Sequence, residues 1–200
     1  MDVLVPFAGR DPKTRLGNTL SSDERRAIAA SMRRDVCEAI RDAGYEPTVL
    51  STAPIDTDVP VVVDERSLSV AVNDRLDPPM AVVMADLPLA TPEALTRIFD
   101  ADGDVVIAPG LGGGTNVLLV RHPEFRVDYH GASVRDHRRA ATEIGATIET
   151  VDSFRLAVDV DETADFVEVL LHTDGRTAQW LEDVGFRLRV DGGRVGIERA

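Results

Sequence analysis

The chain has 200 residues, a formal net charge of −13 and 44% hydrophobic residues, but only 4% aromatic ones. This length suits one α/β domain whose core is built mainly from Val, Leu, Ile and Ala. The acidic balance argues against a nucleic acid or an anionic membrane as a partner, because both require a basic face. The single cysteine, Cys37, excludes an internal disulfide and a cysteine metal cluster.

Strands and helices are predicted to alternate along most of the chain. The apolar strand Asp2 to Phe7 is followed by a polar loop to Leu20 and by a helix that Ser21 and Glu24 begin as a capping box. Further strands are predicted at 47–52, 60–64, 80–85, 104–108, 116–121 and about 154–158, with helices at 67–76, 92–99, 133–144 and 162–171. This alternation is typical of a doubly wound, mostly parallel sheet in the α/β class.

The pattern changes after His172. Residues 177–184 have a helical pattern, and 186–190 and 194–198 flank Asp191-Gly192-Gly193, which indicates a hairpin with a three-residue loop. We therefore expect one domain over 1–172, with 173–200 forming a small C-terminal appendage packed on it.

The charged residues are unusual in kind as well as in number. Lysine and arginine together number 22, yet Lys13 is the only lysine. An excess of carboxylates with almost no lysine is typical of proteins that work in concentrated salt, where screening relieves self-repulsion. No basic segment followed by an apolar one opens the chain, and no apolar run approaches the roughly 18 residues of a membrane helix. We expect a salt-adapted, cytoplasmic protein.

Lys13 lies in the loop after the first predicted strand, together with Ala8, Gly9 and Arg15. A lysine ammonium on its flexible stem is a point-charge ligand for phosphate, and a glycine-containing loop after a strand lets backbone N–H groups approach phosphate. The alternative is that Lys13 is merely the last lysine of a lysine-poor chain.

Three aspartates follow predicted strands. Asp86 ends the apolar run 80–85, and ligands of open α/β sheets bind beyond the carboxyl ends of the strands. Asp159 and Asp161 are two residues apart, so on an extended chain both carboxylates face the same ion. Magnesium takes one or two carboxylates plus phosphate oxygens. The alternative is a solvated strand end, with Asp161 as the N-cap of the next helix.

Two further segments are candidate anion binders. The turn at 112–116, with three glycines before Thr115, lets the backbone approach a ligand closely. Gly131 precedes Ser133, which is predicted to cap the next helix, and helix N-termini attract phosphate. His137 in that helix is predicted to be structural rather than a base. Anion binders around three acids indicate phosphoryl or nucleotidyl transfer on a metal-bound nucleotide.

These segments in this order resemble the 2-phospho-L-lactate guanylyltransferases of coenzyme F420 biosynthesis, from a haloarchaeal-like branch. That family is related to the molybdopterin-guanine and sugar-phosphate nucleotidyltransferases. The resemblance covers about residues 3–168 and rests on Pro12 to Leu16, Met84 to Leu89, Gly113 to Asn116, Gly131 with Ser133 and His137, and Asp159 to Asp161. It implies a nucleotide-diphospho-sugar transferase (Rossmann-like) fold, with residues 1–172 as the nucleotidyltransferase domain.

The resemblance also implies a reaction, in which GTP and 2-phospho-L-lactate give lactyl-diphospho-guanosine and pyrophosphate. By similarity the catalytic residues are Lys13, Arg15 and Asp86, and Mg²⁺ is held by Asp86, Asp159 and Asp161. The acceptor is then bound by Thr115, Gly131 and Ser133. The nucleotide is contacted by Ala8, Gly9, Lys13 and Ser69.

Two departures from the family pattern widen the range of possible substrates. Ser69 stands where relatives often carry Asn, which concerns the preference for GTP, and Gly131 lies closer to Ser133 than is usual. Phosphoenolpyruvate and 3-phosphoglycerate are alternative acceptors for the same chemistry. The sequence also leaves open a sugar-phosphate or molybdopterin nucleotidyltransferase and a non-catalytic nucleotide-binding regulator. The oligomeric state is open, with a homodimer as one expectation.

Overall fold

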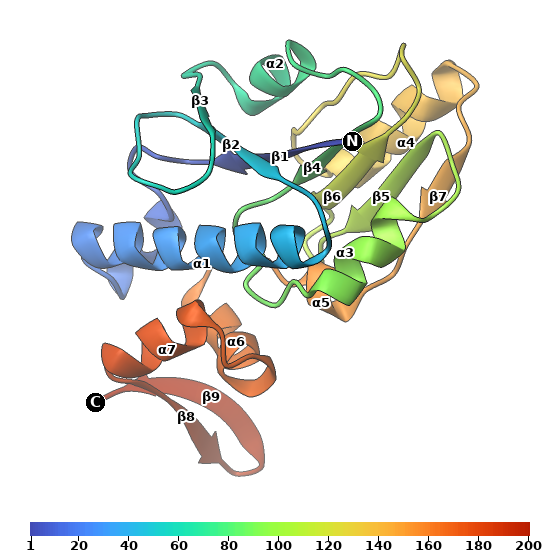
Figure 1. The fold of residues 1–200 in the computed structure, drawn as a ribbon. Coiled ribbons are helices and arrows are strands. Elements are labelled where there is room, and N and C mark those ends of the chain that lie inside the picture. The colour runs from blue at the N-terminus through green and yellow to red at the C-terminus, as the bar shows by residue number, and fades with distance from the viewer.

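A seven-stranded sheet forms the centre of the molecule, with the strand order β3-β2-β1-β4-β6-β5-β7 (Figure 1). The computed structural model describes residues 1–200. The strands are β1 (Asp2–Phe7), β2 (Pro47–Ser51), β3 (Val61–Val63), β4 (Met80–Val83), β5 (Val105–Pro109), β6 (Thr115–Val120) and β7 (Ile148–Thr150). β6 runs antiparallel to β4 and β5, and every other neighbouring pair is parallel. The predicted mostly parallel α/β sheet is confirmed.

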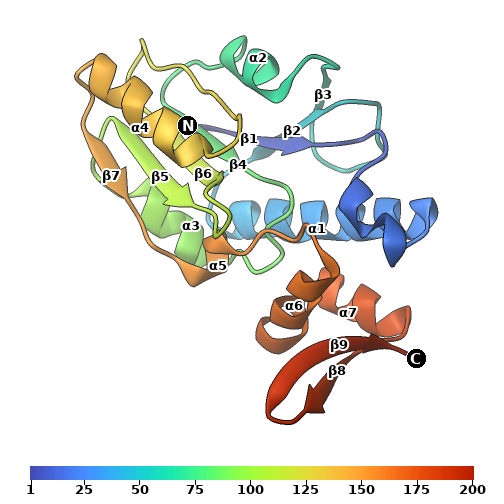
Figure 2. The same cartoon turned by 180° about the vertical axis from the view of Figure 1, so that it is seen from behind.

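Helices cover both faces of this sheet (Figures 1 and 2). One face carries α1 (Ser22–Asp42), α3 (Pro92–Phe99) and the short α5 (Phe154–Ala157), and the other carries α2 (Leu68–Asn73) and α4 (Ser133–Glu143). Successive side chains of a strand point to opposite faces. Val5 and Val83 accordingly join the cluster under α1, whereas Leu4 and Val82 join the cluster under α2 and α4. No helix combines the length and apolar character needed to cross a membrane.

Two helix starts follow the capping signals in the sequence. The Ser21 hydroxyl accepts from the Glu24 N–H, and the Glu24 carboxylate accepts from the Ser21 N–H, so the predicted capping box is confirmed. Thr91 caps α3 by accepting from the Ala94 N–H, with Pro92 in the first turn. Both signals are local, which is why the sequence predicts them well.

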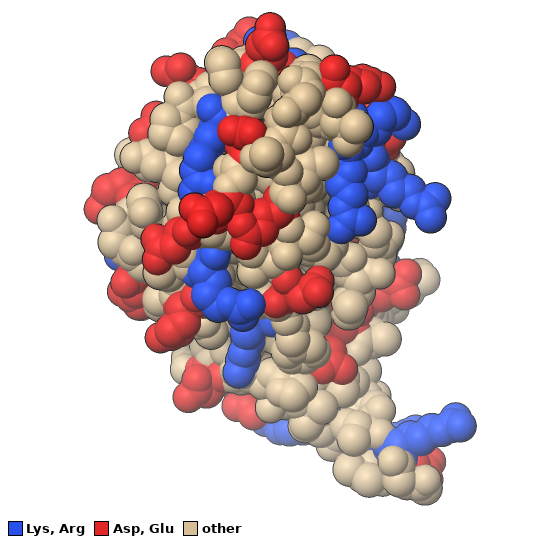
Figure 3. Space-filling view, turned by 90° about the vertical axis from the view of Figure 1, so that its right-hand side faces the viewer, with Lys and Arg blue, Asp and Glu red and all other residues tan.

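α1 also packs against the C-terminal segment. Its first half packs Ile28 and Met32 into a third hydrophobic cluster, together with Phe166, Leu181 and Phe186. These partners belong to α6 (Phe166–His172), α7 (Arg176–Asp183) and the hairpin of β8 (Phe186–Asp191) with β9 (Arg194–Arg199). The hairpin end projects from the sheet body (Figures 1 and 3). The predicted terminal helix and hairpin are confirmed, while the domain boundary at 172 stays a prediction.

Three local predictions are wrong. Residues 154–158 do not form a strand, because the N–H groups of Leu156 and Ala157 both bond to the Ser153 carbonyl and begin the short helix α5. The edge strand β7 at 148–150 has no counterpart among the predicted strands. The hairpin loop has two residues, since Asp191 pairs directly with Arg194. Both loop glycines have positive φ, as a tight hairpin turn requires.

Candidate active site

The loops that follow β1 and β4 meet at one edge of the sheet. β1 and β4 are adjacent and parallel, whereas β2 and β3 extend the sheet on the other side of β1. The chain order therefore reverses between β1 and β4, and open α/β sheets bind ligands beyond the strand ends at such a reversal. Lys13 follows β1 and Asp86 follows β4, so the topology brings the predicted loop and the predicted acid together.

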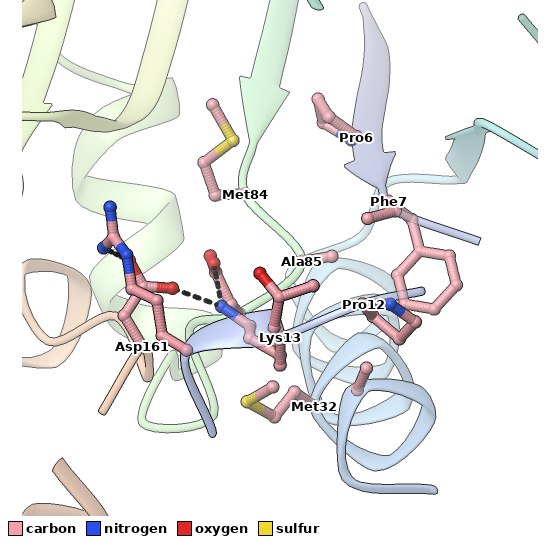
Figure 4. Close-up of a pocket in the computed structure, with 13 residues that line it drawn as sticks. Pro6, Phe7, Pro12, Lys13, Met32, Met84, Ala85 and Asp161 are labelled. Carbon is pink, nitrogen blue, oxygen red and sulfur yellow. Dashed lines mark hydrogen bonds and ion pairs between the residues drawn. The ribbon is translucent and has the colours of Figure 1, made fainter. Parts of the chain in front are cut away.

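The Lys13 ammonium lies between two carboxylates (Figure 4). Its Nζ donates to Asp86 Oδ2 at 2.6 Å and to Asp161 Oδ1 at 2.9 Å. Arg15 Nη1 donates to the other oxygen of Asp161 at 2.9 Å. The Lys13 side chain is 11% exposed and that of Arg15 is 70% exposed. Lys13 is thus a nearly buried cation held by two acids, and Arg15 neutralises one of those acids from the surface.

The pKa values of these groups follow from burial and from the ion pairs. Burial alone would lower the pKa of Lys13, but Asp86 and Asp161 raise it overall. Burial alone would raise the pKa of Asp161, but Lys13 and Arg15 lower it overall. Burial and the charges of Asp86 and Asp161 raise the pKa of Asp159, against a hydrogen bond from Asn116 that lowers it. The three acids are therefore close enough to interact, and Asp159 lacks a cationic partner.

The loop that carries Lys13 has an unusual backbone. Asp11 and Lys13 are the non-glycine residues with positive φ, at 44° and 53°. The left-handed region costs an L-residue about 1–2 kcal/mol, and such strain is concentrated at ligand sites. Arg25 of α1 holds the loop by donating to Asp11 Oδ1 at 2.6 Å and to the Pro12 carbonyl at 3.2 Å. Helix α1 therefore helps to impose the conformation that points Lys13 at the acids.

Gly9 is required by a close approach of the same loop to β2. A Cβ at Gly9 would lie 2.4 Å from Ser51 Oγ and 3.1 Å from the Ala53 carbonyl oxygen. The Ser51 hydroxyl is buried and bonded to the Ala53 backbone, so it has no room to move away. Gly9 is absent from the walls of the two cavities next to this loop, whereas its neighbour Ala8 lines both.

Two adjacent cavities open beside Lys13. The first has a volume of about 310 Å³ and includes Lys13, Asp86 and Asp161 in its wall (Figure 4). The second, of about 210 Å³, extends to Asp64, Arg66 and the start of α2. The cavities share four lining residues: Pro6, Phe7, Ala8 and Met84. A charged chamber joined to a mainly apolar one suits a ligand with one charged end and one apolar end.

Asn116 holds Asp159 in place near the site. Asn116 Nδ2 donates to Asp159 Oδ1 at 3.2 Å and to the Leu156 carbonyl at 2.9 Å. The Val160 N–H donates to the Asp86 carbonyl at 3.1 Å and so fixes this segment beside β4. The residues at 158–161 are not extended strand, so the prediction from strand alternation is wrong. Asp161 lines the charged cavity; Asp159 lines neither cavity, but the charges of Asp86 and Asp161 still raise its pKa. Sequence reasoning missed the role of Asn116, although it directly follows Thr115 in the glycine-rich motif.

Asp161 is not the N-cap of the following helix. The N-cap of the short 3-10 helix at Thr163–Asp165 is Glu162. Asp165 Oδ2 accepts from the N–H groups of Asp161 and Glu162 at 2.8 and 2.7 Å. The Asp161 carboxylate therefore remains available to Lys13 and Arg15. Sequence reasoning also missed Asp165, but its position three residues after Glu162 has the spacing of a capping box.

Thr115 and Ser133 form a buried cluster with His137. The Thr115 N–H donates to Ser133 Oγ at 2.9 Å, and the Ser133 hydroxyl donates to Thr115 Oγ1 at 3.2 Å. His137 Nδ1 lies 2.8 Å from Thr115 Oγ1, and its Nε2 accepts from the Asp128 N–H at 3.0 Å. Because Nε2 accepts, the proton of the neutral ring is on Nδ1. Burial lowers the pKa of His137 to about 4, which agrees with a structural histidine.

The prediction that Ser133 caps α4 is wrong. The N-cap position belongs to Ala132, and no side chain caps the helix there, because the Ser133 hydroxyl is engaged by Thr115. Gly131 is exposed and has a φ of 52°. Ser69 lies in α2, where its hydroxyl accepts from the Tyr129 N–H at 2.9 Å. None of these residues lines the two cavities, so their ligand contacts stay predictions.

The acids fit a metal that arrives with a nucleotide. No three His, Cys, Asp or Glu side chains are grouped so that they could hold a metal ion by themselves. Asp86 and Asp161 nevertheless converge on one cation, the Lys13 ammonium, within 2.9 Å. Magnesium commonly takes one or two carboxylates and completes its shell with phosphate oxygens and water. The donor set therefore suits a metal–nucleotide complex better than a preformed metal cage.

The fold and this site are those expected of a nucleotidyltransferase, and solved structures share the fold. A candidate nucleotide-diphospho-sugar transferase from Desulfovibrio desulfuricans has a similar fold, with a TM-score of 0.70 and 15% identity over 92% of this chain and 95% of that one. A nucleotidyl transferase from Methanothermobacter has a TM-score of 0.57 and 16% identity over 91% of this chain and 98% of that one. These likenesses confirm the predicted fold.

The sequence narrows this class to one family. The family described as "Guanylyl transferase CofC like" matches residues 1–197. The chain is 62% identical to the 2-phospho-L-lactate guanylyltransferase of Natronomonas pharaonis, over 100% of this chain and 99% of that protein. It is 57% identical to the protein of that name from Halomicrobium mukohataei, over the full length of both. The chain belongs to the CofC-like guanylyl transferases. The family match extends over the C-terminal segment, where the sequence contains none of the motifs on which the resemblance rests.

Proposed function

We propose that this protein transfers GMP from GTP to 2-phospho-L-lactate, with release of pyrophosphate. The observation that carries the proposal is the cluster of Lys13, Asp86 and Asp161 at the sheet reversal of a chain that matches 2-phospho-L-lactate guanylyltransferases over its whole length. Such a reaction forms lactyl-diphospho-guanosine, which belongs to coenzyme F420 biosynthesis. We further propose a cytoplasmic location, where GTP is available.

The bond-forming step needs little help from a base. A phosphate oxygen of phospholactate attacks the α-phosphorus of GTP, and the bond from that phosphorus to the bridging oxygen of the β-phosphate breaks. A phosphate monoester is already largely a dianion near neutrality, because its second pKa is about 6. The barrier comes from bringing one anion to another, so the protein has to neutralise and align the two substrates.

Lys13 is the residue best placed for that neutralisation. Its side chain is 11% exposed and lines the charged cavity, and its ammonium is held only by side-chain partners. A nucleotide phosphate in this cavity would replace one carboxylate as its partner at little cost, since one charge-assisted hydrogen bond is exchanged for another. Arg15, at the rim, would assist from the solvent side.

Asp86, Asp161 and Asp159 would hold Mg²⁺, which supplies positive charge to the phosphate oxygens when bound. Asp86 and Asp161 would contribute oxygens directly, and Asn116 would orient Asp159. Where no Mg²⁺ neutralises them, these carboxylates would repel a phosphate group, and so they would disfavour a nucleotide bound without the metal.

The two cavities suggest how the nucleotide lies. The phosphates would occupy the charged chamber beside Lys13, and guanine would enter the second chamber past Phe7 and Met84, which line both. Ala8 and Gly9 would contact the nucleotide by their backbone. Ser69 would act from α2, next to Leu68 in the wall of the second chamber.

The acceptor would bind toward the N-terminus of α4. Thr115 and Ser133 have buried side chains that already bond to each other, so they would shape this region rather than reach far into it. Gly131 is exposed and has no neighbour that a Cβ would touch, which leaves its backbone open to a small carboxylate. Backbone N–H groups at this helix end favour an anion.

The test is pyrophosphate release in concentrated KCl with Mg²⁺ and GTP, with phospholactate, phosphoenolpyruvate or 3-phosphoglycerate added in turn. We expect release with phospholactate, and a loss of about 100-fold or more in Asp86→Asn, which keeps the size of the side chain but removes its charge. Asp183→Asn, at the end of α7 and outside both cavities, is the matched control. Release only with another acceptor, or release without any acceptor, would refute the proposed substrate.

A further inference from the structure

A third cavity, apart from the two beside Lys13, is lined by arginines. It has a volume of about 400 Å³ and lies along α1, between the loop at 57–58 and the start of α7. Four of its nine lining residues are Arg33, Arg34, Arg41 and Arg176. It shares no residue with the other two cavities. The chain has a net charge of −13, so four arginines in the wall of one cavity are an unusual local concentration of positive charge.

The carboxylates in the cavity wall do not neutralise all of its arginines. Arg41 pairs with Asp58 at 2.7 Å, and Arg176 pairs with Glu38 at 3.2 Å. Asp42 is the third acid of the wall, so the lining carries four arginines against three carboxylates. The exposed Arg34 side chain makes no hydrogen bond and no ion pair. A positive charge without a partner therefore faces the cavity.

Arg33 supplies the observation that points to a ligand. This residue is 2% exposed, and one of its terminal nitrogens donates to the Thr57 hydroxyl. Its Nε is buried and has no hydrogen-bond partner at all. A buried charged donor left without a partner is costly, and native proteins rarely tolerate one. The protein itself therefore compensates the Arg33 charge poorly, and an anion in the adjoining cavity would offset that charge.

We propose that this cavity is a binding site for a small oxyanion of the phosphate type. A guanidinium is planar and presents paired donors that match two oxygens of one such anion. Arg33 would contribute its positive charge from the floor, and Arg34 its unpaired guanidinium from the rim. Arg176, at the first position of α7, would close the site, so the anion would also hold the C-terminal segment against α1.

The site has a short physical connection to the nucleotide cavities. The Arg33 guanidinium carbon lies 5.4 Å from the centre of the Phe7 ring, over its face. Phe7 in turn lines both cavities beside Lys13. An anion that fixes Arg33 therefore also fixes the position of Phe7 through a cation–π contact. Occupancy of the arginine cavity would then change how well GTP fits.

The test is calorimetric titration of the full-length protein with inorganic phosphate at a fixed KCl concentration. Because phosphate can also bind at Lys13, the titration is repeated on Lys13→Met, where binding in the arginine cavity should persist. We expect Arg34→Gln to weaken this binding about tenfold, the effect of one lost charge-assisted hydrogen bond. Arg194→Gln, an exposed arginine of β9, should leave the affinity unchanged.

Three results would overturn the binding site: no phosphate binding to the wild type, complete loss of binding in Lys13→Met, or equal affinities in wild type and Arg34→Gln. The connection to Phe7 has its own readout in Arg33→Met, checked for folding by its circular dichroism. We expect its KM for GTP to rise about three- to fivefold with kcat nearly unchanged, as a cation–π contact of ordinary strength implies. An unchanged KM would overturn the connection.

Discussion

Lys13 is bound by two carboxylates that lie 73 and 148 residues away along the chain. Its neighbours in sequence supply the strained loop, but its partners come from the turn after β4 and from the segment before α6. Breaking this arrangement would leave Asp86 and Asp161 facing each other without a shared cation. Their mutual repulsion is strengthened by partial burial, since the effective dielectric constant is lower there than in water.

We expect Lys13→Met to lower kcat/KM by about 100- to 1000-fold, the usual effect of removing one preorganised positive donor from a phosphoryl-transfer site. Lys13→Arg should recover only part of the activity, because a planar guanidinium does not replace a compact ammonium between two carboxylates. The measurement is initial-rate pyrophosphate release over a range of GTP concentrations. A Lys13→Met enzyme within about threefold of the wild type would remove Lys13 from the catalytic set.

His137 links stability to pH. Its pKa in the folded protein is about 4, against 6.5 for an ordinary histidine, because it is buried. Between these pH values the unfolded chain binds a proton that the folded chain does not, so stability falls as the pH falls. The unfolding free energy therefore has its full value, as far as His137 is concerned, above pH 6.5. It is lower by about 3 kcal/mol once the pH has fallen below the folded-state pKa of about 4.

We expect His137→Gln to reduce the slope of unfolding free energy against pH by about 1 kcal/mol per unit between about pH 4.5 and 6. The measurement is denaturant unfolding of both proteins across that range. The variant should also be less stable near pH 7, because the Thr115 hydroxyl loses a partner. Identical slopes would mean that the folded protein protonates His137 in this range.

At the scale of secondary structure, α1 performs two packing tasks at once. Its second half packs Val36 and Ile40 on the sheet, and its first half packs Ile28 and Met32 on the C-terminal segment. Met32 also lines the charged cavity, and Arg25 holds the Lys13 loop. This helix therefore connects the sheet, the site and the C-terminal segment.

The loop after β1 depends on its contact with β2. Because a Cβ at residue 9 would lie 2.4 Å from the buried Ser51 hydroxyl, we expect Gly9→Ala to force the two segments apart. The expected loss in unfolding free energy is about 1–3 kcal/mol, as for other overpacked sites, together with a higher KM for GTP. Denaturant unfolding and initial rates measure these two effects.

Gly17→Ala is the matched control, since its Cβ would meet only the Arg25 guanidinium at 3.7 Å. Its stability should lie within about 0.5–1 kcal/mol of the wild type, with a gain expected from the lower entropy of the unfolded chain. Equal effects of both substitutions would contradict the close approach at Gly9.

At the scale of the whole molecule, the charge of −13 opposes the binding of two anionic substrates. Carboxylates are interspersed with arginines over the face shown in Figure 3, so no broad basic surface there offsets the repulsion. The Debye length is about 10 Å at 0.1 M salt and about 3 Å at 1 M, so concentrated salt removes the long-range part. Local attraction at Lys13 acts over a shorter distance and is screened less.

We expect kcat/KM to rise several-fold between about 0.05 M and 2 M KCl, at constant Mg²⁺ concentration, because screening removes the repulsion. Unfolding measured in the same buffers separates this effect from a gain in stability. Full activity at about 0.05 M KCl in folded protein would contradict the salt requirement.

Much of the fold could be predicted because its signals are local. The apolar run at 80–85 predicts a buried central strand, and the caps at Ser21 and Thr91 place two helix starts where the structure has them. The loop around Lys13 and the motif Gly113 to Asn116, in order with the segments around Asp86 and Asp161, are enough to predict the family. The failures, α5 and β7, are short elements whose conformation depends on what they pack against.

Only the tertiary structure decided which of these residues touch. The reversal of strand order places Asp86 on Lys13, while Asn116 and Asp165 hold the 159–161 segment without a strand. The free Nε of Arg33 and its contact with Phe7 are likewise invisible in sequence. Propensity and capping act over a few residues, so a sequence records them directly. Contacts between distant segments depend on how the sheet is ordered and packed, which no local pattern encodes.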